Sequence, residues 1–311
     1  MILEGQKVVV TGAAGFIGSH LVRRLVACGA SVTGIDNERS GLWSRVPGEL
    51  CRAVHADFAH CSDAELAEAL AGADVLFHLA AEKYNSSKSS PQKVIDVNIS
   101  GTQRLFEAAL AAGVSQTVFT SSLYAYGSLG PEDMRESDVL RPITTYGMSK
   151  VAGEDILRSF RFRYGFSSAV ARLFFVYGPG QFAEGGYKSV IVSNFERLAR
   201  GESPVVFGDG RQELDYVYVD DVVRALIMLA DPDTDGTTVN IGSGRGYSIN
   251  EVTEAMVQVA GAQTRSEFGD PDWTHGSRRV GSRELAEQSL AWVPDIDFET
   301  GLRAVWNGYN V

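Results

Sequence analysis

Tyr146 and Lys150 are the clearest candidates for chemistry in this sequence. They lie four residues apart in a stretch with a helical pattern, Thr145–Phe160, so one helix face would carry both side chains. A tyrosine in water has a pKa of about 10 and is a poor base at neutral pH. A neighbouring ammonium favours the phenolate, which would let Tyr146 take a hydroxyl proton while hydride leaves the same carbon. Because the chain has 11 tyrosines, the pair by itself is equally compatible with a solvated surface helix.

The position of this pair along the chain favours a functional role. The predicted helix comes after the segment Thr120-Ser121-Ser122, which ends a predicted parallel strand. Ligands of α/β proteins bind at the carboxyl ends of such strands. Ser122 would then hold a substrate hydroxyl by a hydrogen bond, and the alternative for Ser122 is a turn residue at the end of a strand.

A second candidate site is the glycine-rich turn Thr11–Gly18, which follows a strand-like run and opens a helical one. Glycines spaced G-x-x-G-x-x-G permit a tight turn, close approach to a pyrophosphate and close packing of helix on sheet. The helix N-terminus adds free N–H groups and the positive end of its dipole. Asp36 ends the next strand, where a carboxylate accepts both ribose hydroxyls of NAD and repels the 2′-phosphate of NADP. We therefore predict NAD as the cofactor, held at this turn by Gly12, Ala14, Gly15, Phe16, Ile17 and Gly18.

The elements that must position these residues follow from the apolar pattern. Strands are expected at residues 8–10, 31–35, 52–55, 75–79, 117–120 and 168–173, and helices at 16–27, 64–70, 92–112 and 145–160. Runs that are apolar on both faces indicate strands buried in a parallel sheet, so we predict a Rossmann-type, doubly wound α/β fold. After about Gly178 the elements become shorter and glycine denser. This predicts an NAD-binding domain over residues 1–178 and a smaller α/β substrate lobe over 179–311, with later segments crossing back.

Composition narrows the class of protein further. The net charge of -11 argues against nucleic acid or an acidic membrane surface as the main partner. Cys28, Cys51 and Cys61 are odd in number and lack ligand-like spacing, so neither a disulfide framework nor a metal site is expected. No signal peptide or membrane-spanning run is recognisable, and a cytoplasmic enzyme with reduced thiols is expected.

The chain resembles the extended short-chain dehydrogenase/reductase family, in particular its NAD-dependent epimerases and dehydratases of nucleotide sugars. The resemblance covers nearly the whole chain. It is carried by Thr11–Gly18, Asp36-Asn37, Asp57, His78–Ala81, Asn98-x-x-Gly101-Thr102, Thr120–Ser122, Tyr126-Gly127, Tyr146-x-x-x-Lys150, Arg172, Val176–Gly180, Gly208–Gly210 and Tyr218–Asp221.

The resemblance implies roles for residues on both sides of the cofactor. Expected NAD contacts beyond the glycine turn are Asp36, Asn37, Asp57, Phe58, Leu79, Ala80, Ala81, Lys83, Tyr146 and Lys150. Asp57 and Phe58 would lie at the adenine, and Lys150 would also hold the nicotinamide ribose. A homodimer formed through helices 92–112 and 145–160 is implied as well. The implied chemistry is C4 oxidation of a nucleotide-linked hexose, after which the 4-keto sugar is rotated, deprotonated at C5 or dehydrated, and hydride is often returned.

Departures from the family pattern bear on the substrate and the reaction. The 4,6-dehydratases carry an Asp-Glu pair where this chain has Leu123-Tyr124, so 4,6-dehydration is not expected. Phe175 and Leu214 replace an asparagine and an arginine that contact the nucleotide in relatives. An arginine can bind a diphosphate with two parallel hydrogen bonds, and the alternative for the arginines is a solvated loop charge. An aromatic ring can stack on a nucleotide base, and the alternative for Phe207 is a place in the core. The expected substrate-binding residues are Tyr124, Phe175, Val190, Phe207, Arg211 and Arg278, with Arg279 as a second candidate beside Arg278.

Glu82 follows the strand end at Ala81 and stands beside Lys83. It is expected either to act as a base at C5 or an acid at the C6 hydroxyl, or to form a salt bridge with Lys83. Two reactions stay open: 5,6-dehydration, known from tunicamycin-type antibiotic biosynthesis on UDP-N-acetylglucosamine, and 4-epimerisation of a UDP-sugar. Glu82 and the Leu123-Tyr124 segment favour elimination slightly. A non-catalytic NAD-binding sensor is a remote third alternative, since Tyr146 and Lys150 are both present.

Overall fold

The computed structural model describes residues 3–127, 130–181 and 188–309. The chain forms two compact units. The first comprises Met1–Ser128, Ser137–Leu173 and Val223–Val239, and the second comprises Leu129–Glu136, Phe174–Val222 and Asn240–Val311. The chain therefore passes into the second unit after Leu173 and returns to the first at Val223.

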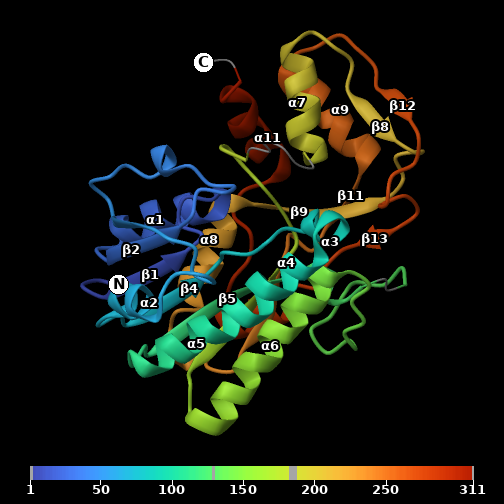
Figure 1. The fold of residues 1–311 in the computed structure, drawn as a ribbon. Coiled ribbons are helices and arrows are strands. Elements are labelled where there is room, and N and C mark those ends of the chain that lie inside the picture. Colours follow the sequence, from blue (N-terminus) through green and yellow to red (C-terminus); the bar gives the residue numbers. More distant parts are fainter. Residues whose placement is uncertain (1–2, 128–129, 182–187, 310–311) are drawn as a thin grey trace. The chain divides into compact units, whose positions relative to one another are not determined.

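A seven-stranded sheet forms the centre of the first unit (Figure 1), with β10 at one edge running on into the second unit. The strands are, in spatial order, β10 (Thr238–Ile241), β6 (Ser168–Leu173), β5 (Gln116–Ser122), β4 (Val75–His78), β1 (Lys7–Thr11), β2 (Ser31–Asp36) and β3 (Arg52–His55). Each neighbouring pair from β6 to β3 is parallel. The strand order reverses between β1 and β4, which is the point where Rossmann proteins bind dinucleotides. The predicted Rossmann-type α/β fold is confirmed.

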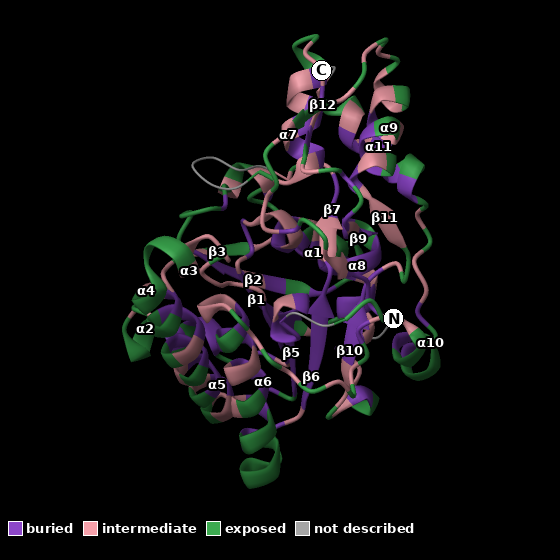
Figure 2. Ribbon diagram, turned by 90° about the vertical axis from the view of Figure 1, so that its right-hand side faces the viewer, coloured by how far each residue is buried: buried purple, intermediate pink, exposed green. Residues whose placement is uncertain are grey.

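The inner strands are buried on both faces, as their continuous apolar sequences predict. Every residue of β4, β5 and β6 is buried, and Figure 2 shows β5 and β6 in the colour of buried residues. Four longer helices of this unit are α1 (Phe16–Ala27), α2 (Asp63–Leu70), α5 (Thr102–Ala111) and α6 (Thr145–Tyr164). Helix α6 is capped at its N-terminus by Thr144, whose hydroxyl accepts from the Gly147 N–H at 3.0 Å, and at its C-terminus by Gly165, which has a left-handed φ of 65°.

The helix expected over residues 92–112 is interrupted by a wide turn. Helix α4 (Pro91–Ile95) leads into a π-helical turn, η2 (Asp96–Gly101), before α5 begins. A short helix, α3 (Ser86–Ser89), precedes them. At Gly101 a Cβ atom would lie 2.5 Å from the Ala59 Cβ, so this turn packs close to the loop after β3. The extra residue in a π turn rotates the side chains that follow, and here the turn contains the buried Asn98.

The second unit is built around β9 (Glu213–Tyr218). This strand pairs in parallel with β7 (Phe175–Tyr177) and β13 (Arg278–Arg279) and antiparallel with β11 (Gly246–Ser248). Strands β8 (Val205–Phe207) and β12 (Glu267–Gly269) form a separate pair. The remaining helices of the chain are α7 (Val190–Ala199), α8 (Val219–Met228), α9 (Ile249–Ala260), α10 (Glu284–Leu290) and α11 (Phe298–Asn307). Among the described residues, no helix has the length and apolar character needed to cross a bilayer.

Candidate active and cofactor site

The glycine turn after β1 has the shape of a phosphate cradle. Gly12 has a φ of +73°, and a Cβ there would lie 2.9 Å from the backbone N of Ala80. A Cβ at Gly18 would collide with the carbonyl oxygen of Gly12, so only glycine lets α1 start this close to the turn. The N-cap of α1 is Gly15, which offers no side chain to the first N–H groups of the helix. Such N–H groups bind anions, and the cradle therefore fits the pyrophosphate of a dinucleotide.

Asp36 connects this turn to the loop after β2. Its Oδ2 accepts from the Ala14 N–H at 3.0 Å, and its Oδ1 accepts from the Glu38 N–H at 2.7 Å. Burial raises the pKa of Asp36 above its ordinary value, and the two backbone hydrogen bonds act in the opposite direction. The carboxylate thus lies beside the cradle, where the ribose hydroxyls of NAD are expected.

The residues expected at the adenine end lie in two different environments. Asn37 Nδ2 donates to Asp57 Oδ2 at 3.1 Å, so these two side chains form one polar wall. Phe58 is only 5% exposed and packs edge-on against His78, with ring centres 5.0 Å apart. Its ring belongs to the hydrophobic core, so the aromatic side chain does not face an adenine, and a contact there would come from the Phe58 backbone.

Ser122, Tyr146 and Lys150 meet at the carboxyl end of β5. The Ser122 hydroxyl is close enough to that of Tyr146 to lower the pKa of the tyrosine. The Lys150 Nζ lies 5.6 Å from the centre of the Tyr146 ring and donates to the Thr120 carbonyl at 2.8 Å. The strand end supplies the serine and one anchor for the lysine, and the first turns of α6 supply the tyrosine and the lysine. The structure therefore brings together three of the four predicted catalytic side chains.

Burial shifts both titratable members of this group. It raises the pKa of Tyr146 to about 12, and the Ser122 hydrogen bond acts in the opposite direction. It lowers the pKa of Lys150 to about 8, opposed by the Glu154 carboxylate one helical turn further along. At neutral pH the phenol is protonated and the lysine is charged. A basic Tyr146 therefore depends on nearby positive charge, which Lys150 and an oxidised nicotinamide ring both supply.

A buried ion pair connects helix α6 to strand β6 of the sheet. Arg172 on β6 donates to Glu154 on α6 through Nε at 3.0 Å and through Nη2 at 2.7 Å. Arg172 also donates to the Tyr126 hydroxyl at 3.0 Å, and the Ser121 hydroxyl donates to Glu154. Both charged side chains are 4% exposed. Such a bidentate pair fixes α6 against the end of the sheet.

Glu82, the fourth predicted catalytic residue, has both carboxylate oxygens engaged. Its Oε1 lies 2.5 Å from the Lys93 Nζ and 3.5 Å from Nη1 of Arg39, and its Oε2 accepts from the Ser86 hydroxyl at 2.8 Å. The salt bridge expected with Lys83 is therefore made with Lys93 and Arg39 instead. The reason is tertiary, since α4 and the loop after β2 bring these cations to the carboxylate. Lys83 lies close enough to Asp36 and Glu82 for both charges to raise its pKa, although burial lowers it more.

Asn98 is a positioning residue to which the motif analysis assigned no role. Its Oδ1 accepts from the Glu82 N–H at 2.7 Å, and its Nδ2 donates to the Glu82 carbonyl at 3.0 Å and to Ser149 Oγ at 3.0 Å. One amide thus holds the loop after β4 to the catalytic helix. The signal in the sequence was the Asn98-x-x-Gly101-Thr102 pattern, but its function depends on the π turn.

Tyr124 lies beside Tyr146, and a further aromatic ring lies beside Tyr124. Tyr124 meets Tyr146 edge-on at 5.7 Å between ring centres. Tyr84 stacks on Tyr124 at 4.7 Å. Tyr84 was not among the predicted residues, and its place two residues after Glu82 was the available signal.

The other substrate candidates all belong to the second unit. Phe175 on β7 packs against Tyr216 at 5.8 Å, Val190 is the first residue of α7, and Phe207 ends β8 with 48% exposure. Arg211 is exposed.

Arg278, by contrast, is already engaged. It lies 2.9 Å from Glu213 and 2.7 Å from Asp133, and it donates to the Pro131 carbonyl at 3.0 Å. Neighbouring Arg279 is buried, with its guanidinium 4.9 Å from the Trp273 ring centre.

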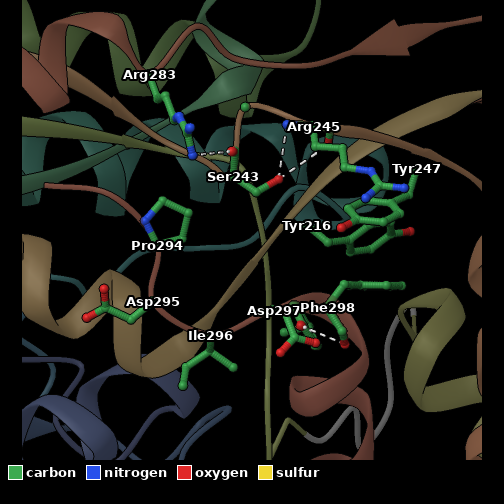
Figure 3. Close-up of a pocket in the computed structure, with 12 residues that line it drawn as sticks. Tyr216, Ser243, Arg245, Tyr247, Arg283, Pro294, Asp295, Ile296, Asp297 and Phe298 are labelled. Atoms are coloured by element: carbon green, nitrogen blue, oxygen red, sulfur yellow. Dashed lines mark hydrogen bonds between the residues drawn. The ribbon is translucent and has the colours of Figure 1, made fainter.

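A cavity of about 410 Å³ lies in the second unit (Figure 3). Its aromatic wall includes Tyr247, which stacks on Phe298 at 4.3 Å and carries the Arg245 guanidinium 4.4 Å above its ring centre. Arg283 lies on the opposite side and donates to the Ser243 carbonyl at 3.3 Å. No predicted substrate residue lines this cavity, so it is not the site that the sequence analysis anticipated.

Comparison with known proteins identifies the relatives of this chain. Residues 8–242 match the NAD dependent epimerase/dehydratase family. The UDP-glucose 4-epimerase of Mycolicibacterium smegmatis is 36% identical over 304 residues, which are 95% of this chain and 96% of that protein. The crystal structure of a UDP-glucose 4-epimerase from Thermotoga maritima with UDP-glucose has a TM-score of 0.92, with 31% identity and 98% and 99% of the two chains covered. A UDP-N-acetylglucosamine 4-epimerase from Methanobrevibacter ruminantium, in complex with UDP-N-acetylmuramic acid, has a TM-score of 0.93, with 29% identity and 99% of both chains covered.

The Rossmann sheet, the glycine cradle and the Ser122–Tyr146–Lys150 group together define an enzyme of the short-chain dehydrogenase/reductase type. Within that class, the chain belongs to the NAD dependent epimerase/dehydratase family. The predicted family, the NAD cofactor and the assignment as a nucleotide-sugar epimerase/dehydratase are thereby confirmed.

Proposed function

We propose that the protein is a 4-epimerase of a UDP-linked hexose or N-acetylhexosamine. The observation that carries this proposal is that neither place considered for a further acid or base, Leu123-Tyr124 or Glu82, offers a free carboxylate. Leu123 and Tyr124 follow Ser122, and the Glu82 carboxylate is bound by Lys93, Arg39 and Ser86. Inversion at C4 needs only the Ser–Tyr–Lys group, whereas elimination needs a further acid or base.

Three residues of this chain, Ser122, Tyr146 and Lys150, bind the C4 hydroxyl or help to move its proton. NAD, when bound, accepts the C4 hydride and returns it to the sugar. Ser122 holds the C4 oxygen by a hydrogen bond, and the Tyr146 phenol oxygen takes its proton. The Lys150 ammonium, 5.6 Å from the Tyr146 ring, favours the phenolate through its charge. After the 4-keto sugar presents its other face, Tyr146 returns the proton to the C4 oxygen.

The ion pairs of Glu82 shift the balance away from the elimination that the sequence slightly favoured. Lys93 Nζ lies 2.5 Å from Oε1 of Glu82, and the Ser86 hydroxyl donates to Oε2, so both carboxylate oxygens already have partners within the protein. The names of the similar proteins, among them 4-epimerases of UDP-glucose and UDP-N-acetylglucosamine, also support inversion at C4.

The test is incubation of the NAD-loaded enzyme with UDP-glucose and with UDP-N-acetylglucosamine in deuterated water, followed by NMR. We expect inversion at C4 and no deuterium at C5. Deuterium at C5 or loss of the C6 hydroxyl would overturn the proposal in favour of elimination. Tight NAD binding with no turnover of either sugar would favour a sensor.

A matched pair of tyrosine variants tests the catalytic assignment itself. Tyr146→Phe should keep the fold and NAD binding but lower turnover by about 10²- to 10⁴-fold, because it removes the proton-transfer group. Tyr164→Phe, at the 53% exposed end of the same helix, is the control and should change turnover little. Activity of Tyr146→Phe above about a tenth of the wild type would refute the role of Tyr146.

We further propose that the protein is a homodimer through α4 to α6, as the resemblance implies. Apolar side chains are exposed on these helices: Ile95 is 39%, Met148 56% and Phe162 92% exposed. Light scattering after gel filtration should give a dimer, and Met148→Glu should weaken it. A monomer at micromolar concentration would contradict this proposal.

A further inference from the structure

We propose that Arg39 and Glu82 form an ionic clasp across the dinucleotide-binding edge, which slows the release of NAD. This inference rests on NAD binding and not on which reaction follows C4 oxidation. The two side chains come from the loops after β2 and β4 and meet at 3.5 Å, between Nη1 of Arg39 and Oε1 of Glu82.

The strand order places this contact above the glycine turn. β1 lies between β2 and β4 (Figure 1), and neighbouring strands are about 4.8 Å apart, so β2 and β4 are separated by about 10 Å. Side chains from the loops after β2 and β4 can meet only by crossing the carboxyl end of β1. That end carries Gly12 and Gly15, where the pyrophosphate is expected. A dinucleotide that extends from Asp36 towards Lys150 must also pass over the carboxyl end of β1.

Glu82 is the fixed half of the clasp. Its side chain is 12% exposed, and Lys93 and Ser86 hold its two carboxylate oxygens. Asn98 binds both its backbone N–H and its carbonyl. The position of this residue is therefore set by three side chains that do not include Arg39.

Arg39 is the half that can open. Its side chain is 57% exposed, whereas the rest of its loop is fixed to the cradle. The Leu42 N–H donates to the Ala14 carbonyl at 3.0 Å, and a Cβ at Gly41 would lie 2.7 Å from the Ala14 carbonyl carbon. Rotation of one exposed arginine side chain breaks the pair without moving the backbone, so the clasp can admit NAD and then close behind it.

The effect should be kinetic and modest. An ion pair with one exposed partner contributes up to about 1 kcal/mol, which corresponds to a change of up to about fivefold in a rate constant. Salt screens such a pair, since the Debye length falls from about 10 Å at 0.1 M to about 3 Å at 1 M.

The experiment measures NAD release from the holoenzyme. Loaded enzyme, freed of excess NAD by gel filtration, is mixed with ethanol and excess alcohol dehydrogenase, which reports released NAD as NADH absorbance. Arg39→Gln and Glu82→Gln should each speed release by about two- to fivefold, and Arg39→Lys should restore most of the slow rate. Raising the ionic strength from 0.05 to 0.5 M should speed release from the wild type more than from Arg39→Gln.

The control is Arg303→Gln, which removes a similarly exposed arginine (58%) from its ion pair with Glu299 in the second unit and should leave release unchanged. Faster release in Arg39→Gln but not in Glu82→Gln would mean that Arg39 contacts NAD directly and would overturn the clasp. Unchanged release in Arg39→Gln, or the same salt dependence as in the wild type, would also overturn it.

Discussion

Replacing Arg172 with methionine should destabilise the first unit by several kcal/mol. Arg172 and Glu154 are each 4% exposed, and Arg172 makes two hydrogen bonds to the Glu154 carboxylate and one to the Tyr126 hydroxyl. Methionine fills much of the same volume but leaves the carboxylate buried without its cation. Breaking a buried ion pair on one side costs about 3–5 kcal/mol, which for a domain of this size lowers Tm by about 10 °C.

The double variant Glu154→Leu/Arg172→Met separates two costs: the loss of the ion pair itself, and the burial of a Glu154 carboxylate without its cation. With both charges removed, the remaining cost comes from Ser121 and Tyr126, which each lose one hydrogen-bond partner. That cost is about 1–3 kcal/mol, so the double variant should be more stable than Arg172→Met alone. The expected coupling energy between the two positions is therefore at least about 2 kcal/mol.

The assay is urea unfolding followed by circular dichroism, at two NAD concentrations so that differences in cofactor binding can be removed. The reasoning is refuted if Arg172→Met costs less than about 1 kcal/mol, or if the effects of the two single substitutions simply add in the double variant.

Three further outcomes are expected. Gly18→Ala should weaken NAD binding at least about tenfold, because its Cβ would push the Gly12 carbonyl out of the cradle; titration should show no change for Gly48→Ala, whose Cβ would meet nothing within 4 Å. Asp36→Ala should weaken NAD binding more than NADP binding, because it removes both the hydrogen bonds to the ribose hydroxyls of NAD and the repulsion of the 2′-phosphate of NADP. Equal losses of affinity would count against the ribose role of Asp36. The pKa of Lys150 is lowered from 10.5 to about 8. Between these two pH values the unfolded chain binds more protons at this lysine than the folded chain does, so the free energy of unfolding increases as the pH rises. The stability of the wild type relative to Lys150→Met should therefore grow by about 2 kcal/mol from pH 7.5 to 9.5, and parallel pH profiles would rule this out.

Several features of the site were predictable because they depend on residues close together in the chain. The glycine spacing after β1 and the four-residue step from Tyr146 to Lys150 each lie within one turn or one helix face. The carboxyl end of β5 was located by its apolar run, and Ser122 lies there, close enough to lower the pKa of Tyr146. The glycine turn and Asp36 also indicated NAD, and family resemblance added the nucleotide sugar, which local patterns do not specify.

The partners of charged and aromatic side chains were not predictable in the same way. Arg278 was a candidate for a diphosphate, but the structure pairs it with Asp133 and Glu213, which are far from it in the sequence. The resemblance put Phe58 at the adenine without saying which of its atoms lie there, and the structure packs its ring on His78 in the core. Each outcome depends on which distant element packs against the residue.

The sequence by itself determined the Rossmann fold, the cofactor cradle and the Tyr146–Lys150 pair, because periodicity and spacing act over one strand or one helical turn. Only the tertiary structure decided the surroundings of Glu82. Lys93 from α4, Arg39 from the loop after β2 and Asn98 from a π turn converge on this residue. A carboxylate is a proton donor, a base or an ionic anchor according to the charges within a few ångströms, and those neighbours are set by packing between elements.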